Sequence, residues 1–216
     1  MKRRFAEYGE RVFDDHQLLE LLLFYAVPQG DVNPLAHELI KQFGSLSGVL
    51  DASPEELRKV KGVGEHTASF LTMLPQIMRR YELSRTKGAA VITSSNDAGE
   101  YLLPYFFGAK KEMLYMLSLD SAGRVLACDL LAEGGLDQVM LDPRTVVEVA
   151  MKRRAISVIL AHNHVTGLAL PSDIDISLTK SLRPLLRSLN IRLVDHLVIA
   201  DKVFTSMVRT GAISMT

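Results

Sequence analysis

Residues 155–175, with the sequence AISVILAHNHVTGLALPSDID, decide the fold of the second half of the chain. Residues 155–161 form an apolar, partly β-branched run, which is typical of a buried strand. Gly167 and Pro171 interrupt the pattern and predict a loop. Ser172 is a typical N-cap residue and predicts that a helix over residues 172–190 follows the loop. A buried strand, a loop and a helix in this order indicate part of a sheet on which helices pack.

The flanking segments predict the rest of this sheet. Apolar runs at residues 113–120 and 124–132 are separated by a short Ser-Ala-Gly turn and predict a hairpin. Residues 143–154 have a helical pattern with a basic end, as suits a helix C-terminus. Residues 191–200 predict a further strand. The second half is therefore expected to be a mixed α/β (α+β) domain.

The first half predicts short helices and no strand. Apolar positions and helix signals predict one helix over residues 14–26, a second between Asn33 and Gly44, a third that starts at Ser53, and a longer fourth from Gly64 to about Leu83. Residues 84–90 lack periodicity and predict a linker. We therefore expect a helical domain over residues 1–86 and the α/β domain over residues 91–216.

Composition excludes several classes of protein. The chain has 216 residues, of which 48% are apolar, and 25 basic residues balance 25 acidic ones. The apolar stretch at residues 18–27 is far shorter than the ~20 residues of a membrane-spanning helix, so we expect no membrane association. Residues 1–5 are basic but no apolar region follows them, so a cleaved secretory signal is not expected. The single cysteine, Cys128, excludes an internal disulfide and favours a reducing cytoplasm.

The end of the buried strand has the features of a metal site. His162 and His164 are two residues apart in the strand, so both imidazoles point to the same face. Asp173 and Asp175 lie in the first turn of the helix that follows, from which a carboxylate can turn back toward the strand. Two histidines and one carboxylate leave a coordination position open, as in catalytic zinc sites. In the alternative interpretation the histidines hold no metal, and Ser172 and Asp173 only cap the helix.

The spacing of these residues resembles a known family. His-x-His, seven residues, Ser, two residues and Asp is the motif of the JAMM (JAB/MPN) metalloprotease-like domain. The segments around it are similar to the RadC family, which has His-Asn-His here and an Asp-His-Leu-Val-Ile strand downstream, matched by residues 195–199. The first half also resembles the RadC amino-terminal helical domain. The chain departs from the family at Val165-Thr166, where RadC proteins have Pro-Ser, which affects the loop more than the ligands.

The resemblance implies a set of functional residues. It implies His162, His164 and Asp175 as ligands of one zinc ion per chain. It implies Glu112 as the general base and then the proton donor, and the Ser172 hydroxyl as the group that stabilises the oxyanion.

Three further side chains leave alternatives open. Glu133 and Glu148 are alternatives to Glu112 as the base. His196 is a partner of the ligands, a substrate contact or a histidine satisfied in the core.

A second motif lies in the first half. Lys61-Gly62-Val63-Gly64 sits between two expected helices, as in a helix-hairpin-helix. Its glycines allow a tight turn and expose backbone N–H groups at the start of a helix, where a phosphate can bind. The hairpin is equally compatible with a structural role or with protein binding. Glu65 stands where a basic residue would favour phosphate.

We therefore expect a metal-dependent hydrolase that uses an activated water to cleave an amide or isopeptide bond of a peptide or protein substrate. The alternatives are a DNA-binding, repair-associated protein that contacts DNA through the hairpin, a nuclease that uses the same metal site, and a scaffold whose site holds no ion.

Overall fold

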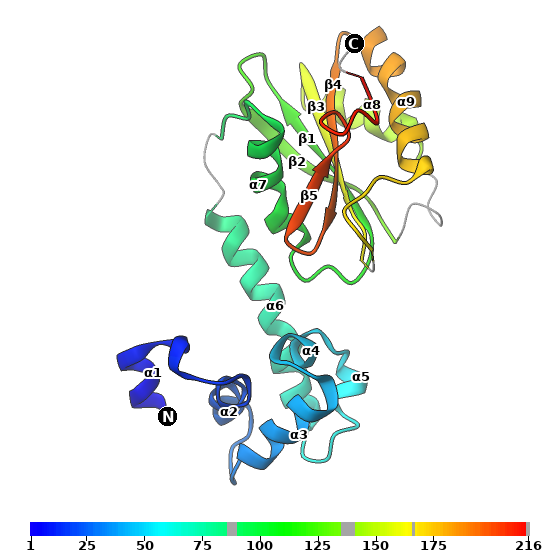
Figure 1. Ribbon diagram of the computed structural model, residues 1–216. Coiled ribbons are helices and arrows are strands. Elements are labelled where there is room, and N and C mark those ends of the chain that lie inside the picture. Colours follow the sequence, from blue (N-terminus) through cyan, green and yellow to red (C-terminus); the bar gives the residue numbers. More distant parts are fainter. Residues whose placement is uncertain (86–89, 135–140, 166, 215–216) are drawn as a thin grey trace. The chain divides into compact units, whose positions relative to one another are not determined.

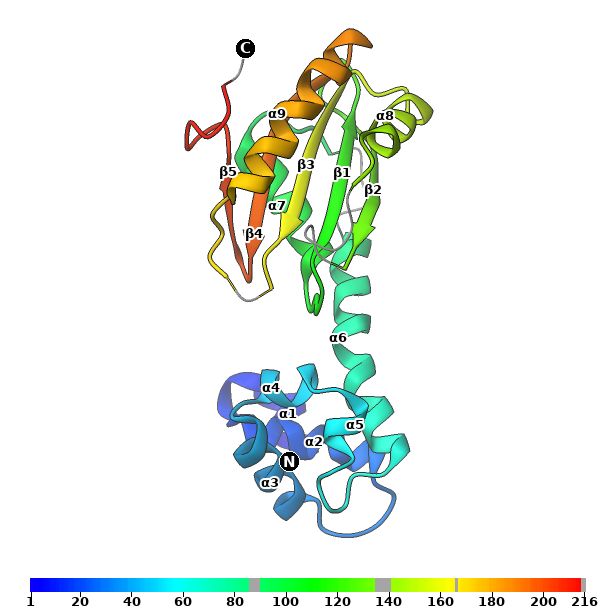
Figure 2. The same ribbon diagram turned by 90° about the vertical axis from the view of Figure 1, so that its right-hand side faces the viewer.

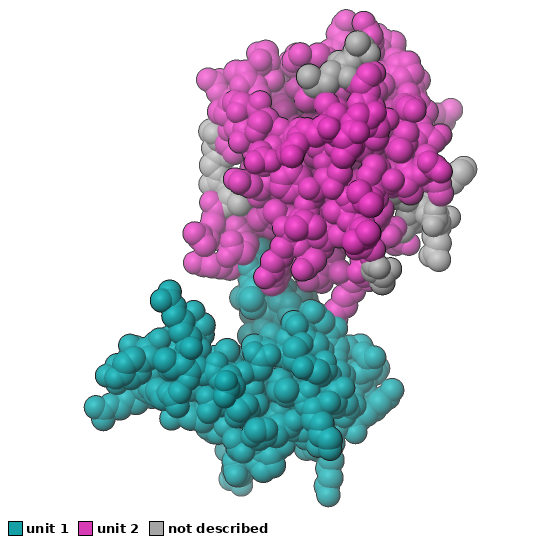
Figure 3. Space-filling view, viewed as in Figure 1, with its two compact units in different colours: residues 1–80 teal, residues 81–216 magenta. Residues whose placement is uncertain are grey.

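The computed structural model describes residues 1–85, 90–134, 141–165 and 167–214. The chain divides into two compact units, Met1–Arg80 and Tyr81–Thr216 (Figure 3), and each is described by itself. The expected domain limits, 1–86 and 91–216, stay a prediction. The expected linker at residues 84–90 starts too early, because a helix continues through Arg85. Residues 86–89 of that linker lie outside the described residues.

Unit 1 is helical, as the sequence predicts (Figure 1). Its elements are α1 (Lys2–Tyr8), the short 3-10 helix η1 (Glu10–Val12), α2 (Asp15–Ala26), α3 (Asn33–Phe43), α4 (Leu46–Asp51), α5 (Pro54–Leu57) and α6 (Glu65–Arg85). Asp14 and Ser53 close capping boxes at the starts of α2 and α5. Gly44 ends α3 in the left-handed conformation, with φ 86°, which glycine adopts without strain. Leucines and valines from α2 to α6 form the core of this unit.

Unit 2 contains a five-stranded sheet in the order β2-β1-β3-β4-β5 (Figure 2). Its elements are α7 (Ser95–Phe106), β1 (Met113–Leu119), β2 (Val125–Glu133), α8 (Pro143–Lys152), β3 (Ser157–Asn163), α9 (Asp173–Ser188), β4 (Arg192–Ala200) and β5 (Val203–Ser206). The pair β3 and β4 is parallel and is connected through α9, and the other neighbouring strands are antiparallel. The expected mixed α/β class is therefore confirmed.

Helices cover both faces of the sheet. Helix α7 packs on one face, where Leu102 joins Leu117 and Ile159 in a core cluster. Helices α8 and α9 pack on the other face, where Leu182 joins Leu160. Strand β3 is buried along its whole length because it is central and covered on both sides. None of the helices that the structure describes is long and apolar enough to cross a membrane.

The structure corrects two features of the expected fold. The central strand runs over Ser157–Asn163 rather than residues 155–161, because His162 still pairs with Leu114 of β1 and Val198 of β4. The short helices α1, η1 and α4, helix α7 and strand β5 were missed. The start of α7 did carry a signal, since Ser94 and Asp97 form a capping box.

A buried carboxylate joins three elements of unit 2. Asp195 of β4 is 1% exposed. Its Oδ2 accepts hydrogen bonds from the hydroxyls of Ser95 (2.7 Å) and Ser206 (2.6 Å). Its Oδ1 accepts from the backbone N–H groups of His196 (2.8 Å) and Val208 (3.2 Å). Four donors thus depend on one side chain.

Replacing Asp195 by alanine is expected to lower the free energy of unfolding by at least about 3 kcal/mol, because it leaves several buried donors without an acceptor. Urea denaturation of the purified variant measures this loss. Ser95→Ala, which removes one donor, is expected to cost about 1 kcal/mol. A loss below about 1 kcal/mol in Asp195→Ala would contradict the expectation.

Candidate metal centre

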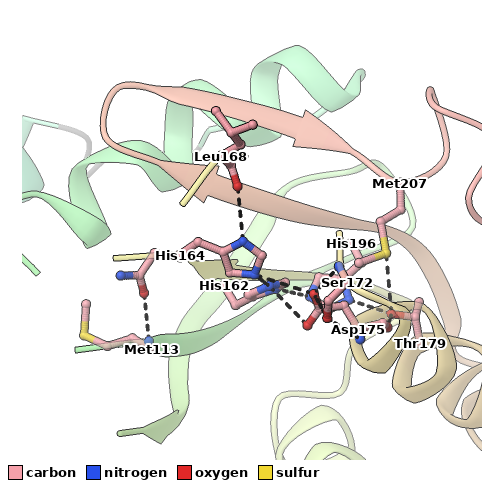
Figure 4. A network of polar contacts seen from close by, with 10 residues as sticks. Met113, His162, His164, Leu168, Ser172, Asp175, Thr179, His196 and Met207 are labelled. Carbon is pink, nitrogen blue, oxygen red and sulfur yellow. Dashed lines mark hydrogen bonds and ion pairs between the residues drawn. The ribbon is translucent and has the colours of Figure 1, made fainter. Parts of the chain in front are cut away.

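The centre lies where β3 ends and α9 begins (Figure 4). The side chain of Asn163 fixes the end of β3, because it forms hydrogen bonds with the backbone at the start of β1 and just before it. Its Oδ1 accepts from the Met113 N–H at 2.7 Å, and its Nδ2 donates to the Lys111 carbonyl at 3.1 Å. Side chains two residues apart on a strand share a face, and Leu160 packs with Leu182 of α9, so His162 and His164 turn to the α9 side of the sheet.

The cap of α9 orients the carboxylate of Asp175. Ser172 and Asp175 form a capping box, in which Asp175 Oδ2 accepts from the backbone N–H (2.7 Å) and the hydroxyl (2.6 Å) of Ser172. The carboxylate is 1% exposed, and its Oδ1 lies 3.2 Å from His162 Nε2. The capping box therefore leaves one carboxylate oxygen directed at the histidines.

Three side chains converge at the centre with the spacing of metal ligands. His162 Nε2 lies 3.0 Å from His164 Nε2 and 3.2 Å from Asp175 Oδ1, and His164 Nε2 lies 3.6 Å from Asp175 Oδ2. Ligand atoms about 2.0–2.1 Å from a tetrahedral ion are about 3.3 Å apart. The separations between the two imidazole nitrogens and the carboxylate oxygens are therefore close to those between ligands of one tetrahedral ion.

The contacts of two of these side chains indicate atoms that are available to a cation. Asp175 Oδ1 is buried and has no hydrogen bond of normal geometry to any described residue. His164 Nδ1 lies 3.2 Å from the carbonyl of Leu168, which can only accept, so Nδ1 carries a proton and Nε2 is the nitrogen that can offer a lone pair to a cation. Lone pairs and a carboxylate directed at one point fit a cation.

The ionisation of Asp175 suits such a role. Burial raises the pKa of this carboxyl, but a proton on the facing His162 ring, followed by the hydroxyl and backbone N–H of Ser172, lowers it by more and holds the pKa well below its usual range. Asp175 is therefore ionised at neutral pH, as a metal ligand must be.

Two buried residues lie behind His162. His162 Nδ1 is 2.9 Å from His196 Nε2, and His196 Nδ1 is 2.6 Å from Thr179 Oγ1. Burial lowers the pKa of His196 well below its ordinary value, and a positive charge on His162 would lower it further, so the ring of His196 is neutral. His196 is thus in contact with the candidate ligand His162, which is the first of its three expected roles. Thr179 was not predicted from the sequence. Its position four residues after Asp175 places both residues on the same face of α9, which is a signal that could have identified it.

Glu112 lies immediately before β1. Leu114 pairs with His162, so Glu112, two residues before Leu114, lies at the same end of the sheet as the histidines. Of its alternatives, Glu133 forms an ion pair with Lys111 at 3.7 Å, and Glu148 is exposed on α8. The role of Glu112 as a base stays a prediction.

Ser172 also lies at the centre. Its hydroxyl donates to Asp175, so stabilising an oxyanion requires the hydroxyl to rotate away from that carboxylate. This role too stays a prediction.

The hairpin of unit 1 has the expected turn. Gly62 has φ 100°, a conformation that favours glycine, and Val63 is buried against the core. Lys61 is exposed, and a side chain at Gly64 would meet open space. DNA binding here stays a prediction, and Gly64 rather than Gly62 is the position at which to test it, because a substitution at Gly62 strains the turn.

Comparison with known proteins identifies the class. A family model described as the RadC-like JAB domain matches residues 92–212, which is more than half of the chain and includes the whole centre. The chain is therefore a RadC-like JAB domain protein. A second model, the UPF0758 N-terminal domain, matches residues 2–69.

The relatives identify the family more narrowly. A UPF0758 protein of Clostridium acetobutylicum is 30% identical over 210 residues, with 97% of this chain and 92% of the relative covered. UPF0758 proteins of Rhodobacter capsulatus and Ruegeria pomeroyi are 36% and 34% identical, with 92% and 98% of this chain and 93% and 94% of the relatives covered. The chain belongs to the UPF0758 (RadC) family, as its resemblance to RadC predicts.

Proposed function

We propose that this protein is a zinc-dependent hydrolase of amide or isopeptide bonds. The observation that carries the proposal is the convergence of His162, His164 and Asp175 at tetrahedral spacing, with a buried carboxylate oxygen that lacks a hydrogen bond. Three protein ligands leave a fourth position for water or substrate, which is typical of catalytic rather than structural zinc sites.

The choice of ion and of reaction follows from the ligands. Two imidazoles and one carboxylate suit zinc better than magnesium or calcium, which prefer oxygen ligands alone. When bound, zinc polarises a carbonyl and makes water a stronger acid, so that hydroxide is available near neutral pH.

The side chains of this chain supply the proton transfers. Glu112, which directly precedes β1 at the end of the sheet that holds the histidines, takes a proton from the attacking water and delivers it to the departing amine. After rotation, the Ser172 hydroxyl donates a hydrogen bond to the oxygen that gains negative charge. Together these steps form the C–O bond, break the C–N bond and leave a carboxylate and a free amine.

The test is a hydrolysis assay with zinc-loaded protein, metal-free protein and His164→Ala. The substrates are a peptide library and peptides joined through a lysine side-chain amide, and the readout is the appearance of free amine. We expect cleavage by the zinc-loaded protein alone. Equal cleavage by the metal-free protein would contradict the proposal, as would cleavage of a DNA phosphodiester without cleavage of any amide.

A further inference from the structure

A chain of short hydrogen bonds connects His162 to the backbone of α9 through the protein interior. It passes from His162 Nδ1 to His196 Nε2 (2.9 Å), from His196 Nδ1 to Thr179 Oγ1 (2.6 Å), and from Thr179 Oγ1 to the carbonyl of Asp175 (2.6 Å). The side chains of His162, His196 and Thr179 are all fully buried. In Figure 4, His196 and Thr179 lie to the right of His162 and His164, with Thr179 on the helix.

The direction of each hydrogen bond follows from the Asp175 carbonyl, at which this series of hydrogen bonds ends. A carbonyl only accepts, so the single hydroxyl proton of Thr179 is directed at Asp175. The Thr179 oxygen must then accept from His196 Nδ1–H. A neutral imidazole carries one N–H, so His196 Nε2 has a lone pair and accepts from His162 Nδ1–H. The Nε2 atom of His162 is left without a proton, facing Asp175 and His164.

We propose that Thr179 and His196 are positioning residues that hold the proton of His162 on Nδ1 and so keep its Nε2 free to bind a metal ion. The proton of His162 is held through two other side chains, whereas the Nδ1 proton of His164 is held directly by the Leu168 carbonyl. The carbonyl that sets the direction of the chain belongs to Asp175, which is itself a candidate ligand. The proposal rests on the metal centre of the proposed function, but it concerns the protein's own proton arrangement, which exists without the ion.

The matched substitutions are Thr179→Val and Thr179→Ser. Valine has the shape of threonine but removes the acceptor of His196 Nδ1–H. The ring of His196 then moves its proton to Nε2 and donates to His162 Nδ1, which forces the His162 proton onto Nε2, where it blocks the ligand position. Serine keeps the hydroxyl and the original direction.

The experiment has two readouts on the full chain at about pH 8, where neutral imidazole predominates. In metal-free protein with ¹⁵N-labelled histidine, NMR couplings between ring nitrogens and carbon-bound protons identify which nitrogen of His162 carries the proton. Competition with a chromophoric chelator measures zinc affinity. We expect Thr179→Val to move the His162 proton to Nε2 and to weaken zinc binding about 10–100-fold, as loss of a group that orients a ligand does. Thr179→Ser should match the wild type in both readouts.

An unchanged His162 proton position or an unchanged zinc affinity in Thr179→Val overturns the proposal, since a role in packing alone leaves the proton where it is. His196→Phe supplies an independent check, because it removes the hydrogen-bond partner of His162 Nδ1 and should weaken zinc binding at least as much. If the wild type binds no zinc, the proposed function fails, and the proton position of His162 in metal-free Thr179→Val still decides this inference.

Discussion

Replacing His164 by alanine is expected to lower the zinc content of the purified protein from about one ion per chain to nearly none. The variant removes one of three ligand atoms, and the two that remain do not hold a catalytic zinc site. His164 is the best ligand to remove first, because its side chain is 20% exposed, whereas that of His162 is fully buried and its loss leaves a cavity. Elemental mass spectrometry of protein purified without chelators measures the result.

Thermal unfolding gives a second measure of the same loss. Zinc that binds only the folded state should stabilise the wild type by about 4 kcal/mol when free zinc exceeds the dissociation constant about 1,000-fold. His164→Ala and Asp175→Asn should lose this stabilisation. His66→Ala, which removes an exposed histidine of α6 in unit 1, should keep it. Full zinc occupancy in His164→Ala would disprove the ligand assignment.

Replacing Glu112 by glutamine is expected to lower kcat about 10²- to 10⁴-fold with the zinc content unchanged. Glutamine has the size of glutamate but cannot take the proton of the attacking water, and a positioned general base contributes this range. Glu112 directly precedes β1, two residues before Leu114, which pairs with His162. The measurement is kcat on a substrate found in the hydrolysis assay, together with zinc content.

Glu133→Gln and Glu148→Gln are the matched controls, because each removes one of the other two candidate bases. Both should retain kcat within a few-fold of the wild type. A glutamine at position 112 that leaves kcat unchanged, or a large loss in Glu133→Gln, would move the role of the base to another carboxylate.

Much of the fold follows from local patterns in the sequence. The central strand, the hairpin before it and the helix after Ser172 are marked by apolar runs and a capping residue, because their burial and their ends are local properties. The position of the strand end at Asn163 is not determined by the local sequence. It depends on pairing with β1 and β4, which carries a polar His162 into the strand. Strand β5 is similar, since its four residues are defined by pairing with β4.

The candidate site divides in the same way. The spacing of the two histidines and the aspartate is visible in the sequence, because one strand end and one helix start bring them together. The sequence leaves His196 with three alternative roles, and it does not show the contact between His196 and Thr179, since α9 and β4 meet only in the folded sheet. The hydroxyl of Ser172 is a comparable case, because only the structure shows that it donates to Asp175.

Asp175 has two roles, as part of the helix cap and as a candidate ligand, so finding this aspartate in a related chain does not by itself indicate a metal site. Its Oδ2 closes the cap of α9 and its Oδ1 faces the histidines, so helix stability alone favours an acid three residues after the serine. We expect the Ser-x-x-Asp pair to be kept in related proteins that have lost the ion, while the two histidines are replaced by other residues. Among divergent copies of this domain, the histidines therefore report retained metal chemistry, and the aspartate reports a retained helix.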